Sequence, residues 1–376
     1  MKAKHTAPGA SMPFILDDPF ADERLSASGI ATPLVSIILT NYNYGRYVEA
    51  CLDSVERQSY RNFECLIVDD VSTDDSPARI KAFIARAKEP EKFTLIERTE
   101  NGGQMEGFRT GLAHCKGTFV VLLDADDVLL PDFLETHLTA HLGVKTVAFT
   151  STNQYQIDGQ GVLTGGDHLD HQGKGQFRFA PDHTFHRGYW IWATASSMMF
   201  RKTVLDLIFP DPDVTFRICA DYFVAHFAQL LGNSLLIPTI HGCYRRHGEN
   251  NFGSNPIIGA LNSVGSMDKH PPHDDFRKAM IAHVLRHFDR FHVILGPRVF
   301  ALLMFRLNRL GELLRLYDAH PDKFRSPKRV LVRRYLAYRV QKYFIENRPW
   351  PQKLKLIKTP QPATSPHASP AKVRPE

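Results

Sequence analysis

Short apolar runs alternate with amphipathic segments over the first 150 residues. The runs that predict strands cover residues 34–39, 63–68, 93–97 and 118–123. Between them, apolar residues at intervals of three and four predict helices at residues 47–58, 76–87 and 104–114. Strands that alternate with helices of this length pair in parallel through right-handed crossovers. The expected fold class is therefore α/β, with a mostly parallel sheet flanked by helices.

The same pattern continues past Pro131 and then loosens. The elements predicted there are a helix from Pro131 to His141, strands at 146–152, 196–200 and 235–240, and a helix at 220–231. Residues 153–188 show little periodicity and are expected to form a loop-rich region or lid. From about residue 251 the chain is polar, then largely helical and basic, and residues 361–376 have the Pro, Ser and Ala bias of a disordered tail.

Composition places the chain among globular proteins that have one large domain and an appendage. It has 376 residues, of which 43% are hydrophobic and 23% charged, with a net charge of +6. Residues 321–360 hold twelve Lys or Arg but only two acids, Asp322 and Glu346. This basic extension suits peripheral contact with an anionic membrane, through an amphipathic helix, or packing against the domain or a second copy of the chain. Binding of nucleic acid is not expected.

The cysteines and the apolar runs of the chain indicate its cellular location. The five cysteines are odd in number and scattered, which predicts free thiols in a reducing cytosol and neither a disulfide frame nor a zinc site. No apolar core of a signal peptide follows the first charges. The apolar stretch 293–305 is interrupted by Gly296 and Pro297 and is shorter than the roughly 20 residues of a spanning helix. A cytoplasmic location, or one at the inner face of the membrane, is expected.

Three carboxylates crowd the end of the fourth predicted strand, at Asp124, Asp126 and Asp127. Polar residues also follow the first and second strands, at 40–43 and 69–72. Open α/β sheets bind ligands at the carboxyl ends of their strands, and adjacent acids repel unless a cation or hydrogen-bond donors offset them. The sequence therefore predicts a divalent metal bound there together with a phosphorylated ligand.

The chain carries four motifs in order: Val35–Tyr47, Ile67–Ser76, Asn101–Leu112 and Asp124–Asp127. Together they resemble the family 2 glycosyltransferases, which have the GT-A fold, use nucleotide sugars and invert the anomeric centre. One departure is Val71, where glycine is usual. Composition and periodicity predict a flexible leader 1–32, a helical extension 251–360 and the tail 361–376. The resemblance divides the catalytic domain between them into a nucleotide-binding half 33–145 and an acceptor half 146–250.

The resemblance also implies how the donor is held. Thr40, Tyr42 and Asp70 would hold the nucleotide base, with the tyrosine ring stacked on it, and this suits uracil. Asp126 would ligate Mn²⁺ or Mg²⁺ while Asp124 lies beside the ribose. The further residues assigned to the nucleotide are Asn43, Gln104 and Arg245, and the further metal ligand is His247.

Structural alternatives stay open for several of these residues. Tyr42 could pack on the end of the sheet, Asp70 could cap the next helix, and Asn43 could serve the turn. Asp127 is assigned to the turn, and either Arg245 or Arg246 could clamp the diphosphate.

An inverting transfer needs a general base on the acceptor hydroxyl. Asp221, at the start of the helix predicted at 220–231, resembles the acidic pair of the family, although Ala220 stands where Glu or Gly is common. A helix N-terminus keeps a carboxylate anionic, but an ordinary helix cap would show the same pattern. Trp190 and Trp192 could stack on a sugar or pack in the core. The remaining histidines, including His168, His171, His183 and His186, show no shared ligand spacing and are assigned to loops.

The expected function is metal-dependent, inverting transfer from a nucleotide sugar, best a UDP-sugar, to a glycan, lipid-linked saccharide or other hydroxyl acceptor. A nucleotidyltransferase would need a loop rich in Gly and Lys, and residues 40–47 offer only Gly45 and Arg46. A phosphatase with Asp124 as nucleophile would need Gly-Thr where Asp127 and Val128 stand. A nonenzymatic protein that binds a nucleotide sugar, or interacts through its basic tail, is the rival from another class.

Overall fold

The computed structural model describes most of the chain. The described residues are 31–144, 146–168, 170–173, 175–180, 190–248, 250, 272–324 and 326–346, with side chains as far as residue 340. They fall into two compact units, Met1–Leu313 and Leu314–Glu376, and each is described by itself. The predicted leader, the tail, the region around residue 251 and part of the predicted lid lie outside the described residues, so the predicted domain boundaries stay predictions.

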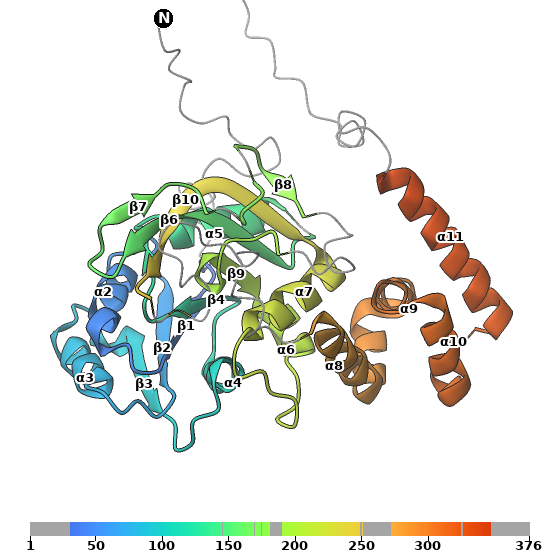
Figure 1. Cartoon of the computed structure of the whole chain (residues 1–376), viewed down its shortest axis with the longest axis horizontal. Helices are drawn as coiled ribbons and strands as arrows, with labels where there is room; N and C mark the ends of the chain where they lie inside the picture. Colours follow the sequence, from blue (N-terminus) through green and yellow to red (C-terminus); the bar gives the residue numbers. More distant parts are fainter. Residues whose placement is uncertain are drawn as a thin grey trace, which may run out of the picture. The chain divides into compact units, whose positions relative to one another are not determined.

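A ten-stranded sheet with helices packed against it forms the body of the first unit (Figure 1). The strands are β1 (Val35–Asn41), β2 (Phe63–Asp69), β3 (Phe93–Glu97), β4 (Phe119–Asp124), β5 (Val128–Leu129), β6 (Phe149–Asp158), β7 (Leu163–Gly165), β8 (Arg178–Phe179), β9 (Met198–Arg201) and β10 (Ser234–Arg246). The helices are α2 (Gly45–Glu56), α3 (Ser76–Arg86), α4 (Gln104–His114), α5 (Phe133–Gly143), α6 (Lys202–Ile208), α7 (Ala220–Gly232), α8 (His273–Arg286) and α9 (Phe288–Leu307). Single 3₁₀ turns are η1 (Pro90–Lys92) and η3 (Ala195–Ser197).

The strand order is β3-β2-β1-β4-β9-β6-β10-β5, with β7 beside β6 and β8 beside β10. β1 pairs in parallel with both β2 and β4, and β10 pairs in parallel with β6. Among the strands on this path, β9 and β5 run antiparallel to their neighbours. The predicted α/β class with a mostly parallel sheet is confirmed.

The second half of the sheet differs from the prediction. β6 continues through residues 153–158, which were expected to be loop, and pairs with β10 as far as Arg246 opposite Asp158. Asn153 and Gln154 of β6 are buried, and each makes a side-chain hydrogen bond: Asn153 Nδ2 donates to Asp167 Oδ1 at 2.9 Å, and Gln154 Oε1 accepts from Thr194 Oγ1 at 2.9 Å. A strand whose buried positions are polar shows no alternation of apolar and polar residues, so the sequence pattern failed there.

Strand register brings the ends of β1, β2 and β4 to one edge of the sheet. Thr40 lies opposite Asp124, and Asn41 lies opposite Asp69. α4 packs closely on β1, because a Cβ at Gly111 would lie 2.4 Å from Ile38 Cγ2. This close approach places Gln104, the first residue of α4, beside the ends of β1 and β4.

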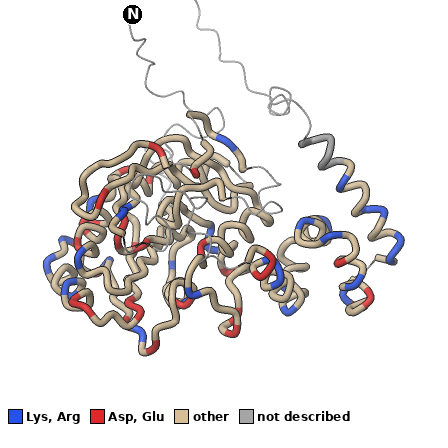
Figure 2. The backbone as a smooth tube through the Cα atoms, viewed as in Figure 1, with Lys and Arg blue, Asp and Glu red and all other residues tan. Residues whose placement is uncertain are grey.

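The C-terminal part of the described chain is helical, as expected. α10 (Leu310–Ala319) is followed by η5 (Pro321–Lys323) and α11 (Lys328–Glu346). Lys and Arg are spread along α11 (Figure 2). Among the described residues, no single helix has the length and apolar character of a membrane span, although α9 and α10, bent by 120° from each other, satisfy that test as a pair.

Gly117 sets the start of β4 and gives the first testable prediction. A Cβ there would lie 2.6 Å from Ser36 N and 2.7 Å from Leu34 O, so Gly117→Ala must displace backbone. We expect a loss of about 1–3 kcal/mol in the free energy of unfolding, measured by chemical denaturation. Gly311→Ala is the matched control, because a Cβ in α10 meets no atom within 4 Å. It should be neutral or stabilising by up to about 1 kcal/mol, and equal losses in the two variants would contradict the prediction.

Candidate active site

A cavity of about 430 Å³ opens at the carboxyl ends of β1 and β4. The residues of the predicted site that line it are Thr40, Tyr42, Asp70, Gln104, Asp124, Asp126 and Asp221. Further lining residues are Tyr44, His168, Asp170, Trp190, Arg217, Tyr222, Tyr244, Arg246 and Asn250. The sequence predicted that the ends of β1, β2 and β4 lie together. In the structure these ends and the first turn of α7 line the same cavity.

Asp124 lies at the centre of this wall. Its Oδ1 accepts long hydrogen bonds from Thr40 Oγ1 and Gln104 Nε2, both at 3.4 Å. Its backbone N–H donates to Ser196 Oγ at 3.1 Å. Burial, followed by the charges of Asp126 and Asp221, raises the pKa of Asp124 to about 7. Two long bonds do not offset this crowding of acids, so the site favours a positively charged ligand.

Gln104 connects the acid motif to α7. Its Nε2 donates to Asp124, while its Oε1 accepts from Ala220 N at 3.0 Å. Ala220 is the first residue of α7, so this one side chain fixes the start of that helix against the end of β4.

Asp221 follows in the first turn of α7 and lines the cavity. Its Oδ1 accepts from Tyr222 N at 2.9 Å. The sequence predicted that the helix N-terminus would favour the anion, but burial outweighs these amides and raises the pKa of Asp221 to about 6. The carboxylate is still ionised at neutral pH, and a pKa near 6 suits a general base.

Asp126 interacts with the segment after β10. His247 Nε2 lies 3.0 Å from Asp126 Oδ2, and Asn250 Nδ2 lies 3.4 Å from the same oxygen. The His247 ring is held between Tyr47, with ring centroids 4.7 Å apart, and the edge of Tyr44, at 5.6 Å. The structure thus brings together Asp126 and His247, the two residues predicted to bind a metal.

Asp127 points away from the cavity into the sheet. Its Oδ1 accepts from Arg245 N at 2.9 Å, and its own N–H donates to Asp124 O at 3.1 Å. Burial, with the charges of Asp126 and Asp124, raises the pKa of Asp127 well above its usual range. These contacts fit the turn role that the sequence suggested, and they tie β10 to the acid motif.

Tyr42 and Asp70 occupy the side of the cavity expected to hold the base. The Tyr42 side chain is 47% exposed, so its ring can accept a stacked partner. Asp70 accepts from Gly102 N at 3.0 Å and Gly103 N at 2.7 Å and forms an ion pair with Arg98. Asp70 therefore shapes the loop before α4, and its carboxylate is largely occupied by these contacts.

Two predicted nucleotide residues do not line the cavity. Asn43 adopts φ 59°, and its Oδ1 accepts from Thr73 N at 2.7 Å, so it joins the loops after β1 and β2. Arg245 donates from Nε to Asp126 O at 2.7 Å and lies over the Tyr47 ring. Successive residues of a strand face opposite sides, and Arg246 is the one of the pair that reaches the cavity.

The structure adds lining residues that sequence reasoning did not assign. His168 was assigned to a loop, yet it is buried and lies against the cavity with Asp170. Arg217, in the segment before α7, also lines it. Trp190 lines the cavity, whereas Trp192 is core, with its Nε1 donating to Ser234 Oγ at 2.9 Å. No periodic or motif signal distinguished His168, Asp170 and Arg217, because they stand in irregular segments, whereas for Trp190 the sequence left sugar stacking and core packing open.

The donor set near Asp126 fits a hard divalent cation. Bonds of about 2.1 Å at right angles place neighbouring ligand atoms about 3 Å apart, and Asp126 Oδ2 and His247 Nε2 are separated by 3.0 Å. Within the described residues no third acid, His or Cys atom of this wall comes close enough to complete a three-ligand cluster. This suits Mg²⁺ or Mn²⁺, which keep several water or phosphate ligands.

Comparison with known proteins gives a consistent picture. Residues 36–204 match the sequence model described as Glycosyl transferase family 2. An uncharacterized glycosyltransferase of Nostoc sp. is 32% identical over 221 residues, covering 58% of this chain and 67% of that protein. Glycosyltransferase GlyG of Streptococcus pneumoniae is 29% identical over 125 residues, or 33% of this chain and 40% of that protein. The crystal structure of S. aureus TarS 1–349 in complex with UDP-GlcNAc aligns with 14% identity and a TM-score of 0.45, over 76% of this chain and 81% of that one, a similarity too low to bear on donor or acceptor.

The raised pKa of Asp221 gives the second prediction. Burial raises it from 3.8 to about 6, so the folded wild type binds an extra proton between these values and loses stability as the pH rises to about 7. Asn does not titrate. The free energy of unfolding of Asp221→Asn, relative to wild type, should therefore increase by about 2–3 kcal/mol from pH 4 to pH 7.

Chemical denaturation over this pH series measures the difference. Asp158→Asn is the control of opposite sign, because amides of Val162 and Gln160 lower the pKa of Asp158. A flat difference for Asp221→Asn across the series would show that burial does not govern this carboxyl.

Proposed function

The chain belongs to glycosyl transferase family 2 and is a glycosyltransferase with the GT-A fold, and we propose that it transfers a sugar from a UDP-sugar to a hydroxyl acceptor with inversion. The observation that carries this proposal is the bridge that Gln104 forms between Asp124 and Ala220 N, the start of α7, which brings the neighbouring Asp221 to the same cavity as Asp124. One carboxylate stands at the donor side, at the end of β4, and the other stands at the start of α7. Such a pair serves two tasks in one reaction, binding of the donor and deprotonation of the acceptor.

The base of the donor nucleotide is assigned to the wall formed by Thr40, Tyr42 and Asp70. The half-exposed Tyr42 ring supports stacking, and Thr40 offers a hydroxyl beside it. The volume of about 430 Å³ lies within the range of small-molecule sites. Uracil remains our proposal for the base.

The leaving diphosphate is assigned to the wall between Asp126 and the two cavity arginines. A divalent cation held by Asp126 and His247 would neutralise the charge that develops on the departing diphosphate. Arg217 and Arg246 line the same cavity and supply fixed positive charge, which suits phosphate oxygens. Arg246 takes the place that the sequence gave jointly to Arg245 and Arg246.

Asp221 is proposed to accept the proton of the acceptor hydroxyl. It lies in the first turn of α7 and has a pKa of about 6, so above pH 6 it is ionised and able to act as a base. Trp190, which stacks on Tyr222 with ring centroids 5.9 Å apart, gives this side an aromatic wall suited to a sugar ring. We propose a glycan or lipid-linked saccharide as acceptor and a cytoplasmic location.

Binding of UDP tests the donor side. Calorimetric titrations with UDP and GDP, each with and without Mn²⁺, should show UDP binding that Mn²⁺ strengthens. Asp126→Ala should abolish that strengthening, a loss of at least about tenfold or 1.4 kcal/mol. Asp132→Ala is the control, since this acid is 58% exposed and does not line the cavity. If neither Mn²⁺ nor Asp126→Ala changes the affinity for UDP, the metal proposal is wrong. Tighter binding of GDP than of UDP would change the proposed base from uracil to guanine.

Turnover tests Asp221. Asp221→Asn should keep UDP affinity within about twofold of wild type and lower the rate of sugar transfer by about 10²–10⁴, because the acceptor loses its base. Release of UDP from a panel of UDP-sugars, with and without candidate acceptors, measures the rate. Near-normal transfer by this variant would exclude Asp221 as the base. Formation of a UDP-sugar and diphosphate from UTP and a sugar phosphate would favour the nucleotidyltransferase rival.

A further inference from the structure

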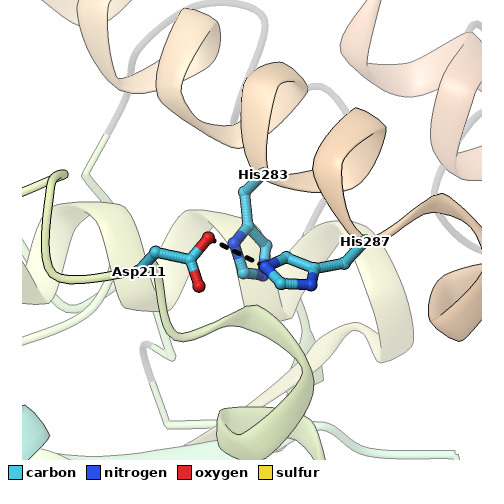
Figure 3. A group of neighbouring side chains, drawn as sticks. All are labelled: Asp211, His283 and His287. Atoms are coloured by element: carbon cyan, nitrogen blue, oxygen red, sulfur yellow. Dashed lines mark hydrogen bonds and ion pairs between the residues drawn. The ribbon is translucent and has the colours of Figure 1, made fainter.

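Asp211, His283 and His287 form a second cluster, outside the cavity (Figure 3). Asp211 lies in the segment between α6 and α7, His283 lies in α8, and His287 lies at the junction of α8 and α9. One ligand atom of each side chain lies within 4.8 Å of the other two. The expectation that histidines outside the motif share no ligand spacing is wrong here, because a spacing of four places both imidazoles on one helix face.

The hydrogen bonds of His283 leave one ring nitrogen available. Its Nε2 lies 3.0 Å from Leu207 O, and since a carbonyl only accepts, Nε2 carries the proton. Nδ1 therefore bears a lone pair. The side chain is 5% exposed, and Nδ1 has no hydrogen-bond partner among the described residues. A histidine that donates one N–H to a carbonyl while its other nitrogen is free has the arrangement of a metal ligand with its outer partner in place.

The other two side chains complete the cluster. His287 Nε2 donates to Asp211 Oδ2 at 2.8 Å, and a metal bound to both atoms would replace this proton, which is released to solvent. The rings of His283 and His287 have centroids 4.7 Å apart. The three side chains point toward one another in Figure 3. Ligand atoms around a tetrahedral metal with bonds of about 2.0–2.1 Å are about 3.3 Å apart, so small side-chain shifts suffice to admit an ion.

The local charge allows a divalent cation. Arg286 donates to Asp211 Oδ2 at 2.8 Å and also binds both oxygens of Asp213 at 2.8 Å. Arg290 is nearby and donates to Asp206 O. The charges of Asp211 and Asp213 offset those of Arg286 and Arg290, so no net positive charge opposes a cation. Arg286 can retain Asp213 when the Asp211 carboxylate turns to a metal.

We propose that Asp211, His283 and His287 bind a transition-metal cation, Zn²⁺ in the first place. Two imidazole nitrogens and one carboxylate are ligands that Zn²⁺, Co²⁺ and Ni²⁺ accept, whereas Mg²⁺ and Ca²⁺ favour oxygen donors. Water takes the fourth position. The site differs in ligand type from the cavity, where acids dominate, and it does not depend on the proposed reaction.

The bound metal would cross-link the segment between α6 and α7, which carries Asp211, to α8, which carries His283. This segment is already held by Arg109, whose Nη2 donates to Asp211 O and Val214 O, both at 3.1 Å. It continues to Arg217 in the cavity wall and to Asp221. This cross-link exists only in the folded chain, because it joins α8 to the segment that supplies these cavity residues. Metal binding should therefore raise the unfolding temperature.

Metal titrations of the full chain test the site. The protein is stripped with a chelator and titrated with Zn²⁺ by calorimetry, with bound metal counted by mass spectrometry. His247→Gln is titrated in parallel, because it removes the imidazole of the proposed cavity site. We expect one tightly bound Zn²⁺ and a higher unfolding temperature in wild type. His287→Gln and Asp211→Asn should each weaken Zn²⁺ binding by at least about tenfold.

Two matched controls isolate the ligands. Asp275→Asn removes an exposed carboxylate on α8 that pairs with Lys278 and offers no ligand atom to the cluster. His114→Gln removes an exposed histidine on α4, whose Nδ1 interacts with Thr110 O. Both controls should bind Zn²⁺ as wild type does. Equal affinity in the ligand variants and the controls would overturn the proposal, as would loss of Zn²⁺ on His247→Gln alone.

A measurement on wild type keeps the test valid if a variant does not fold. Co²⁺ replaces Zn²⁺ and reports its coordination in the visible spectrum. Bands of four-coordinate Co²⁺ with nitrogen ligands, present in wild type and unchanged in His247→Gln, would support the cluster. The weak spectrum of a six-coordinate ion with oxygen ligands only would overturn it.

Discussion

The pair of hydrogen bonds on Asp124 Oδ1 is the interaction on which the active site depends. Thr40 brings the end of β1 to this oxygen, and Gln104 brings α4, which in turn holds Ala220 at the start of α7. Three elements far apart in sequence are thereby fixed around one carboxylate. The two bonds are long, so they position Asp124 without satisfying its charge, and burial with two acidic neighbours raises its pKa to about 7. A wall of this kind is organised without its ligand and gains most from a cation, because the acids are already in place and already repel one another.

The acids at this edge differ because their surroundings differ. Asp127 is turned into the sheet, where its Oδ1 accepts a hydrogen bond from the backbone N–H of Arg245. Asp70 accepts hydrogen bonds from two glycine amides and forms an ion pair with Arg98. Asp221 shows how two opposing effects compare. A helix N-terminus stabilises an anion by about 0.3–1 kcal/mol, whereas the rise of the Asp221 pKa from 3.8 to about 6 corresponds to about 3 kcal/mol in the other direction. Burial is the larger effect, and it moves the carboxylate toward the range in which a base works at neutral pH.

The first half of the fold could be predicted from sequence because its strands are continuous apolar runs and its helices have apolar residues at intervals of three and four. The acids after β4 and the polar ends of β1 and β2 then followed from parallel pairing. The second half could not be predicted in the same way, since buried Asn153 and Gln154 pair with polar partners and hide the strand. The choice between Arg245 and Arg246 depended on which face of β10 meets the cavity, a fact of register that the motif does not contain. His168 and Arg217 line the cavity from irregular segments, where the sequence has no helical or strand periodicity from which their positions could be predicted.

The segment from Asp211 to Asp221 links the two sites of the first unit. It begins at the cluster with α8, is held by Arg109, contributes Arg217 to the cavity and ends at Asp221, the proposed base, in α7. Phe216 O and Arg217 O also accept from the first amides of α4, so the same segment contacts the helix that carries Gln104. Ordering an irregular segment costs conformational entropy, which several contacts along the segment must offset. Contacts at both ends and in the middle confine its backbone, and the position of Asp221 relative to Asp124 then depends on α8 as well as on the sheet. The C-terminal helices of this unit are for that reason part of the active-site scaffold.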